Sequence, residues 1–295
     1  MITGLKDNRL SSVWKWFFES LSDIYDKNEL KSIRKNIFEH YFNLAETDVI
    51  LKDDLLLTET EIVILIKAIN KLKQQRPLQY ITAKAYFLDY VLDVTENTLI
   101  PRPETEELVL LAINQIKQHF HHQDLLKILD VGTGSGCIAI SVADKIKNAE
   151  LTAIDICENA LKTAQQNAKK AEVSVNFMKF DILGNDNLSE VFDVIISNPP
   201  YVRNSEKSLM NKNVLDYEPG IALFVEDDNP LIFYEKICKN ANEGLIAGNG
   251  LIFFEINENL GKETADLLQQ YGFKNIQIHK DMRNKDRFIS AKKIT

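Results

Sequence analysis

The chain has 295 residues, with 35 Lys and Arg against 43 Asp and Glu, which gives a formal net charge of −8 at pH 7. This acidic balance argues against a protein that grips nucleic acid over an extended surface. No apolar run approaches the length of about 18 residues that a transmembrane helix needs, and the N-terminus lacks the apolar core of a signal peptide. The three cysteines have no metal-ligand spacing. We therefore expect a cytoplasmic protein without a metal centre or a membrane partner, and the length favours two domains.

Residues 1–76 are predicted to form a small helical domain. Apolar and aromatic residues recur there at helical spacing, and before Pro77 there is no proline to interrupt the pattern. Thr58 with Glu61 three residues later has the form of a capping box, so we expect the last helix of this domain to begin there. Pro77 restricts the residue before it and should end this helix.

Residues 77–100 change character and are predicted to form a β-hairpin that links two domains. The segment is rich in β-forming residues with partial alternation, which breaks at Glu96 and Asn97. It is followed by Pro101 and Pro103, which make the backbone rigid where the next helix begins. That helix should run from about 104 to 120. Arg102 between the two prolines and Glu106 in the first turn are candidates for one wall of an active site.

From Leu125 onward, strand and helix patterns alternate, which predicts an α/β fold with a doubly wound, mainly parallel sheet. We expect helices from about Cys137 and over 158–171, 230–241 and 258–271. Residues 202–228 show no clear periodicity and are expected to form a long loop. Seven strands are expected, the last two as an antiparallel pair: 126–131, 151–155, 173–177, 192–197, 251–256, 274–278 and 287–291.

A glycine-rich turn follows the first of these strands. It reads Gly132-Thr133-Gly134-Ser135-Gly136 and is preceded by Asp130. A dinucleotide fingerprint wants its third glycine one residue later, where this chain has Cys137. The turn suits an amino-acid carboxylate or ammonium beside a ribose, and Asp155 at the end of the next strand is placed to accept both ribose hydroxyls. The spacing predicts a nucleoside cofactor.

A second motif, Asn198-Pro199-Pro200-Tyr201, follows the buried run that ends at Ser197. Neither proline can donate to a sheet, so the chain must leave the sheet at its carboxyl edge. There the Asn198 Oδ1 and the Pro199 carbonyl could each accept one N–H of a planar group, with Tyr201 stacked on its plane.

Together, these motifs resemble those of class I S-adenosylmethionine-dependent methyltransferases that act on a planar nitrogen. The segment from Ile100 to Glu106 and the pair Glu218-Pro219 narrow the resemblance to the PrmC (HemK) family, the peptide chain release factor N5-glutamine methyltransferases. The resemblance implies a Rossmann-like methyltransferase domain over 101–295, with 1–76 as a substrate-recognition domain. Two departures are Ala83, where the family usually has glycine, and 281–284, which lacks the usual glycine.

The resemblance also implies roles for individual residues. The glycine-rich turn would line the methionine end of S-adenosylmethionine, Asp155 would bind the ribose, and Asp181 with Ile182 would surround the adenine. The cofactor-binding candidates are Asp130, Gly132, Thr133, Gly134, Ser135, Gly136, Asp155, Asp181, Ile182 and Asn198. The catalytic candidates, which would hold a glutamine amide, are Asn198, Pro199, Pro200 and Tyr201.

The expected reaction transfers a methyl group to the side-chain amide nitrogen of the glutamine in the Gly-Gly-Gln motif of class I release factors. The partner would be the release factor, and the enzyme would act as a monomer. Another planar nitrogen stays an alternative, either a ribosomal protein glutamine or an adenine amino group in DNA. A nicotinamide-dependent oxidoreductase is disfavoured by Cys137 and by the Asn-Pro-Pro-Tyr motif. A non-catalytic binding module is disfavoured by the complete motif set.

Overall fold

The computed structural model describes residues 4–52, 54–120, 125–186 and 188–294. The chain divides into two compact units. The first comprises Met1–Ala83 together with Lys212–Tyr217, and the second comprises Lys84–Asn211 together with Glu218–Thr295. No helix within the described ranges is both long and apolar enough to cross a membrane.

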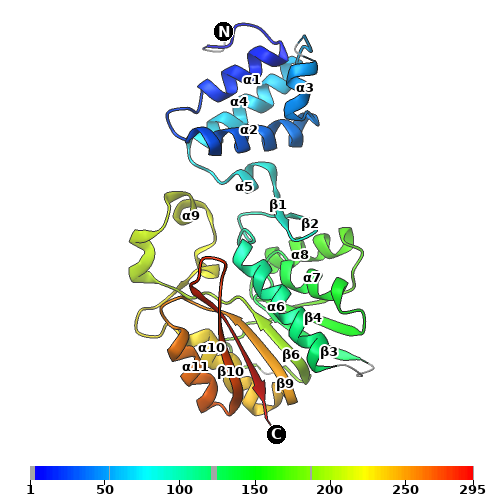
Figure 1. Ribbon diagram of the computed structural model, residues 1–295, viewed down its shortest axis with the longest axis vertical. Coiled ribbons are helices and arrows are strands. Elements are labelled where there is room, and N and C mark those ends of the chain that lie inside the picture. The colour runs from blue at the N-terminus through cyan, green and yellow to red at the C-terminus, as the bar shows by residue number, and fades with distance from the viewer. Residues whose placement is uncertain (1–3, 53, 121–124, 187, 295) are drawn as a thin grey trace. The chain divides into compact units, whose positions relative to one another are not determined.

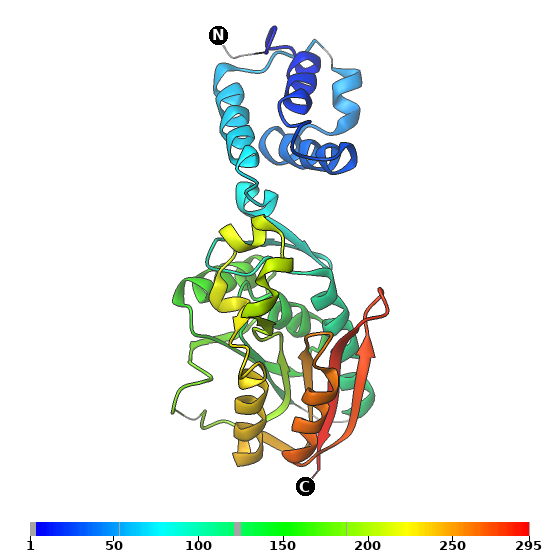
Figure 2. The ribbon, with the colours of Figure 1, turned by 90° about the vertical axis from the view of Figure 1, so that its left-hand side faces the viewer.

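The N-terminal unit is helical, as the apolar periodicity predicted (Figure 1 and Figure 2). One apolar core joins its helices, and Phe17, Ile37 and Leu65 are fully buried in it. Thr58 caps the fourth helix as expected: its backbone N–H donates to Glu61 Oε2 at 2.6 Å, and Glu61 N–H donates back to Thr58 Oγ1 at 3.3 Å. The helices are α1 (Leu10–Glu19), α2 (Lys27–Phe42), α3 (Glu46–Leu51), α4 (Glu59–Lys73) and α5 (Leu78–Thr82).

The link after α4 differs from the expected hairpin over 77–100, because α5 comes first. Pro77 lies at φ −53°, which suits the start of a helix, and the buried Ile81 joins the helical core. Ala83 ends α5 in the left-handed region at φ 54° and ψ 27°. The hairpin itself is shorter than expected and pairs β1 (Lys84–Phe87) with β2 (Tyr90–Asp93) in antiparallel register.

The second unit contains the predicted seven-stranded sheet, in the order β10-β11-β9-β6-β3-β4-β5. Four of its strand pairs are parallel, and the last two strands in the chain form the predicted antiparallel pair. The third strand begins at Asn176, later than expected. The strands are β3 (Leu126–Val131), β4 (Ala149–Asp155), β5 (Asn176–Lys179), β6 (Phe192–Ser197), β9 (Ile246–Glu255), β10 (Phe273–Lys280) and β11 (Asp286–Lys293).

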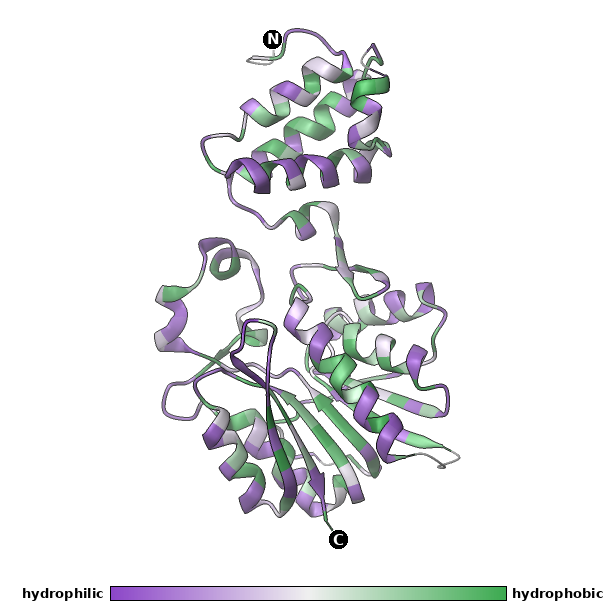
Figure 3. Cartoon of the chain, viewed as in Figure 1, coloured by the Kyte–Doolittle hydropathy of each residue, from purple (hydrophilic) through white to green (hydrophobic). Residues whose placement is uncertain are grey.

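Helices cover both faces of this sheet (Figure 1). Alternate residues of the strands enter two different cores: Ile128 packs on one face and Leu129 on the other. The central strands therefore bury hydrophobic side chains on both faces. In Figure 3 these strands are largely green, the colour of hydrophobic residues. One face carries α6 (Pro103–His119), α7 (Cys137–Lys145) and α8 (Glu158–Lys170), and the other carries α10 (Ile232–Asn240) and α11 (Gly261–Gln270).

The segment 202–228, expected to be an irregular loop, holds several short elements. Two 3-10 helices flank a six-residue α-helix, one two-residue strand begins the segment, and another lies near its end. Elements this short have no room to display a hydrophobic period, which is why the sequence pattern did not reveal them. They are β7 (Val202–Arg203), η1 (Asn204–Leu209), α9 (Lys212–Tyr217), η2 (Gly220–Ala222) and β8 (Phe224–Val225).

The sheet has a topological switch point between β3 and β6. From β3 the chain adds β4 and β5 on one side, whereas β6 lies on the other side of β3. Ser197 Oγ donates to the Val131 carbonyl at 2.7 Å and ties the two strand ends together. Loops that leave parallel strands in opposite directions open a crevice at their carboxyl ends, where α/β proteins bind ligands.

Candidate active site

A cavity of about 230 Å³ lies at this switch point. We call it the strand-end cavity, because its wall is built on the residues that follow β3, β4 and β6. Most of the wall is apolar, and three of its polar side chains, Asp155, Asp181 and Asn198, are site candidates from the sequence. Its lining residues are Asn97, Leu99, Val131, Gly132, Gly134, Ile154, Asp155, Ile156, Cys157, Phe180, Asp181, Ile182, Leu183, Asn198, Pro199, Pro200, Ile221, Ala222 and Phe233.

The three glycines of the turn have different structural roles, although all three adopt positive φ. Gly132 and Gly134 line the strand-end cavity, and a Cβ added at either would meet no atom within 4 Å. A Cβ added at Gly136 would instead lie 3.1 Å from Ala164 Cβ and 3.1 Å from Ile140 Cδ1. The first two glycines therefore leave room for a ligand, whereas the third allows α7 and α8 to pack closely.

Asp130 lies beneath the glycine-rich turn and is 1% exposed. Its Oδ2 accepts the Thr133 hydroxyl at 2.6 Å and the Ala139 N–H at 3.2 Å, so it fixes the turn and the start of α7. Burial raises the pKa of this carboxyl to about 7. The turn reaches the cavity wall only through Gly132 and Gly134. The other candidates of this motif shape the turn without lining the cavity: Asp130, Thr133, Ser135 and Gly136.

Asp155 ends β4 and lines the strand-end cavity. Its Oδ2 accepts the Gly134 N–H at 2.9 Å, and its Oδ1 accepts the Cys157 N–H at 2.8 Å. Burial raises the pKa of Asp155 above its ordinary value, while these backbone donors act in the opposite direction. Each carboxylate oxygen keeps a second lone pair, so the side chain can still accept the two hydroxyls of a ribose.

Asp181 and Ile182 lie together in the same wall, next to Phe180 and Leu183. Asp181 is exposed, and its Oδ1 accepts the Leu183 N–H at 2.9 Å, whereas Ile182 is 8% exposed. A carboxylate beside apolar side chains suits a flat heterocycle with an amino group, since the ring can pack on the apolar atoms while its edge donates to an acceptor.

Asn198 follows β6 and is half-buried in the cavity wall with the two prolines. Its Nδ2 donates to Thr105 Oγ1 at 3.0 Å, and the Thr105 hydroxyl donates to Glu255 Oε2 at 2.7 Å. The amide nitrogen of Asn198 is thus engaged by the protein. Its Oδ1 is the atom available to accept an N–H from a ligand.

Tyr201 is not part of the strand-end cavity wall. Its ring packs against the apolar core on the α10 and α11 face, and its hydroxyl donates to Glu255 Oε1 at 2.9 Å. Burial and the nearby Glu255 carboxylate hold the pKa of Tyr201 well above its ordinary value. The hydroxyl therefore stays protonated and serves as a donor that fixes the ring.

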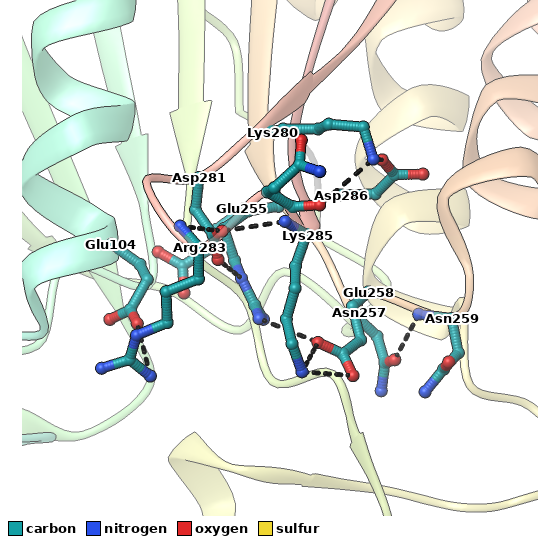
Figure 4. Close-up of polar contacts among 12 residues, drawn as sticks. Glu104, Glu255, Asn257, Glu258, Asn259, Lys280, Asp281, Arg283, Lys285 and Asp286 are labelled. Atoms are coloured by element: carbon teal, nitrogen blue, oxygen red, sulfur yellow. Dashed lines mark hydrogen bonds and ion pairs between the residues drawn. The ribbon is translucent and has the colours of Figure 1, made fainter.

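Glu255, at the end of β9, is 1% exposed, and burial raises its pKa. Arg287 acts in the opposite direction and favours the carboxylate. This arginine is held in turn by Asp281, with Nε to Oδ2 at 3.3 Å, and by Glu258, with NH2 to Oε2 at 3.4 Å. Figure 4 shows Glu255 beside this group and the ion pair between Glu258 and Lys285.

Arg102 and Glu106, the two candidates for an active-site wall, have other partners and are not among the cavity-lining residues. Arg102 pairs with the buried Glu218, whose Oε2 also accepts the Ile100 N–H at 3.2 Å. Glu218 thereby fastens the segment before α6 to the 3-10 turn η2, and both segments contribute residues to the cavity. Glu106 Oε1 accepts the Leu88 N–H at 2.9 Å and caps the hairpin turn.

Several residues of the site were missed by sequence reasoning. Leu99, Ile221 and Phe233 belong to the cavity wall but carry no motif of their own. Thr105 and Glu255 hold Asn198 from positions far away in the chain. Thr105 lies within the Ile100–Glu106 segment that carries part of the family resemblance, and this position is the sequence signal that points to it. In the described ranges, no group of three or more His, Cys, Asp or Glu could hold a metal ion.

Comparison with known proteins gives a family model for each of two segments of the chain. Residues 12–82 match the model of the PrmC N-terminal domain, and residues 111–216 match that of the methyltransferase small domain. A solved structure, the hMettl16 catalytic domain in complex with the MAT2A 3′UTR hairpin 6, aligns with a TM-score of 0.55. The alignment covers 81% of this chain and 83% of that one at 15% identity, and it shows a shared fold.

Two relatives match over nearly their whole lengths, and both are named release factor glutamine methyltransferase. The one from Flavobacterium psychrophilum is 47% identical, with 93% of this chain and 96% of the relative covered. The one from Bacteroides thetaiotaomicron is 35% identical, with 96% and 99% covered. This chain has the seven-stranded sheet of a class I methyltransferase, and it belongs to the family of release factor glutamine methyltransferases.

Proposed function

We propose that this enzyme transfers a methyl group from S-adenosylmethionine to the side-chain amide nitrogen of the glutamine in the Gly-Gly-Gln motif of class I peptide chain release factors. Family membership supports the reaction and the substrate class. The observation that carries the proposal is the strand-end cavity, whose wall joins the glycine-rich turn, Asp155 and Asn198. A cofactor site and an amide-binding loop thus share one space.

The residues present fit this cofactor. At Gly132 and Gly134 the backbone is bare, and a Cβ at either position would occupy open space at the wall, as expected where a ligand approaches the main chain. Asp155 would accept the ribose hydroxyls, and Asp181 with Ile182 would flank the adenine. S-adenosylmethionine, when bound, supplies a methyl group on a positively charged sulfur.

The chain's own contribution to the chemistry is to position the substrate amide. An amide nitrogen is a poor nucleophile because its lone pair is delocalised into the carbonyl. Asn198 Oδ1 and the Pro199 carbonyl would each accept one N–H of the glutamine and hold its lone pair toward the methyl group. Positioning of this kind makes a bimolecular displacement effectively unimolecular and supplies much of the rate. Tyr201, anchored on Glu255, would support the loop from beneath.

The N-terminal unit is proposed to recognise the folded release factor. It exposes a group of apolar side chains at and after α3, and two of them, Ile50 and Leu51, are each 79% exposed. The double substitution Ile50→Glu with Leu51→Glu should raise the KM for the release factor without changing cofactor affinity. Val63→Glu, which alters another exposed side chain of the same unit, is the control. An unchanged KM in the double variant would exclude this surface.

A methyl-transfer assay tests the whole proposal. Label should reach purified release factor, but not its Gly-Gly-Gln variant with Gln→Ala, a ribosomal protein or duplex DNA. Asn198→Ala should lower turnover about 10²- to 10³-fold, by analogy with the loss of one well-placed polar group at a reacting centre. Equal labelling of the loop variant, or preferential labelling of DNA, would overturn the proposal. The cytoplasmic location and the monomeric state stay predictions of the sequence.

A further inference from the structure

The amide of Asn198 can present either its oxygen or its nitrogen to the strand-end cavity, and only one choice suits an N–H donor. An oxygen facing the cavity accepts from a substrate amide, whereas an NH2 group would oppose it. The two orientations have almost the same shape, so packing alone does not select between them. A hydrogen-bond partner must make the choice.

Thr105 is that partner, and its own hydroxyl has a fixed direction. The hydroxyl carries one proton, which it donates to Glu255 Oε2 at 2.7 Å. Toward Asn198, at 3.0 Å, Thr105 Oγ1 can therefore only accept. Only the NH2 end of Asn198 satisfies it, so Oδ1 is left facing the cavity.

Glu255 sets the direction of the whole chain of hydrogen bonds. It is 1% exposed, so water does not compete for its oxygens. Oε2 accepts from Thr105, and Oε1 accepts the Tyr201 hydroxyl at 2.9 Å. One buried carboxylate thereby fixes both the amide and the aromatic ring of the Asn-Pro-Pro-Tyr motif. Thr105 lies in the first turn of α6, Asn198 follows β6 directly, and Glu255 ends β9.

We propose that Thr105 and Glu255 are positioning residues for methyl transfer, which act by holding the Asn198 amide with Oδ1 toward the substrate. This inference rests on the proposed function, because it assumes that Asn198 accepts an N–H of the substrate amide. Neither residue touches the substrate. Without the Thr105 hydroxyl, the Asn198 amide turns freely and spends much of its time with NH2 toward the cavity.

The test replaces Thr105 by Ser, Ala and Val. It asks whether the turnover of the variants depends on the size of the side chain or on the presence of its hydroxyl. Ser keeps the hydroxyl in a smaller side chain, Val keeps the shape without it, and Ala lacks both. Turnover should follow the hydroxyl: within about threefold of the starting enzyme for Thr105→Ser, and about 10- to 100-fold lower for both Thr105→Val and Thr105→Ala, which is the usual loss when a supporting hydrogen bond is removed. Cofactor affinity, measured by calorimetry, should change less than threefold in all of them.

Thr264→Val is the matched control. Thr264 is also fully buried in this unit, but its hydroxyl donates only to the Leu260 carbonyl within a helix, at 2.8 Å. Its turnover should stay close to that of the unchanged enzyme. If turnover of the Thr105 variants follows side-chain volume, or if Thr105→Val is fully active, the inference is wrong. The unchanged enzyme is assayed first on release factor, and failure there refutes the proposed function rather than the positioning role.

Discussion

The backbone N–H of Gly134 donates to Asp155 Oδ2 at 2.9 Å, which links the two cofactor motifs directly. The glycine belongs to the turn after β3, and the carboxylate ends the neighbouring strand β4. The Gly132 and Thr133 N–H groups donate to the Ile154 carbonyl just before Asp155, at 2.9 and 3.0 Å. The shape of the turn therefore depends on the same strand end that would bind the ribose.

Asp155→Ala should weaken S-adenosylmethionine binding by about 1–3 kcal/mol, because it removes a charged acceptor from the ribose and a partner from the turn. Asp155→Asn, which keeps one acceptor oxygen, should give an intermediate loss. Calorimetry measures both. Glu150→Ala alters an exposed acid near the opposite end of β4 and should leave affinity unchanged. Unchanged affinity in Asp155→Ala, or tight NAD binding by the unaltered enzyme, would contradict the cofactor assignment.

Alanine substitutions in the glycine-rich turn should separate stability from binding. Both Gly134 and Gly136 have positive φ, 56° and 84°, so alanine at either costs about 1–2 kcal/mol of backbone strain. Gly136→Ala should lose about 1–3 kcal/mol more, because its Cβ would crowd Ala164 and Ile140. Gly134→Ala has no such clash, so it should lose less stability than Gly136→Ala. Because its methyl group narrows the cavity, it should weaken cofactor binding more than Gly136→Ala does. Urea unfolding and calorimetry on the two variants check this order, and the reverse order would refute it.

The buried Asp130 should make stability depend on pH. Burial raises its pKa to about 7, against about 3.9 in an unfolded chain. Between these values the folded state binds more protons, so this group's contribution to the free energy of unfolding falls as pH rises from about 4 to about 7. The slope is at most about 1.4 kcal/mol per pH unit.

Asp130→Asn removes this titration while keeping the size and an acceptor oxygen. Relative to the variant, the unaltered protein should lose stability steadily from pH 5 to pH 7 and then level off. Urea unfolding of both proteins at several pH values gives the difference, in which the titration of all other groups cancels. A difference that stays constant from pH 5 to pH 8 would show that Asp130 is not protonated in the folded state.

The parts of the fold predicted from the sequence are those that local patterns determine. The central strands β3 and β6 are apolar runs that are buried on both faces, which made them readable in the sequence. Asp155 was placed correctly at the end of its strand, and the acid and the glycine-rich turn lie at the carboxyl ends of adjacent parallel strands. The helix α5 was missed because one helical turn has no readable period. The elements of 202–228 were missed for the same reason.

The residues that hold Asn198 in place could not be predicted from local sequence patterns. Thr105 and Glu255 are 150 residues apart in the chain, and no spacing rule relates them. Thr105 resembles an ordinary residue of a first helical turn, and Glu255 follows the apolar run Leu251–Phe254 as an ordinary acid at a strand end would. Their contact exists only after α6 packs on the sheet and brings its first turn to the end of β9. Buried polar contacts of this kind are a product of the tertiary structure.

Ala83→Gly should stabilise the N-terminal unit, because Ala83 has the left-handed backbone conformation that glycine adopts without strain. Its φ of 54° closes α5, and its N–H donates to the Gln79 carbonyl. The left-handed conformation costs an L-residue about 1–2 kcal/mol, whereas glycine loses about 0.4–1 kcal/mol of that gain through its more flexible unfolded chain. The expected net gain is about 0.5–1 kcal/mol. Both tryptophans of the chain, Trp14 and Trp16, lie in this unit, so fluorescence during urea unfolding reports on it.

The same chemical change at Ala68 provides the matched control. Ala68 is buried within α4, where glycine should lower stability by about 1 kcal/mol because it is a poor helix former. The two variants should therefore shift the tryptophan unfolding midpoint in opposite directions. A lower midpoint for Ala83→Gly would mean that the entropy of the unfolded chain outweighs the strain at residue 83.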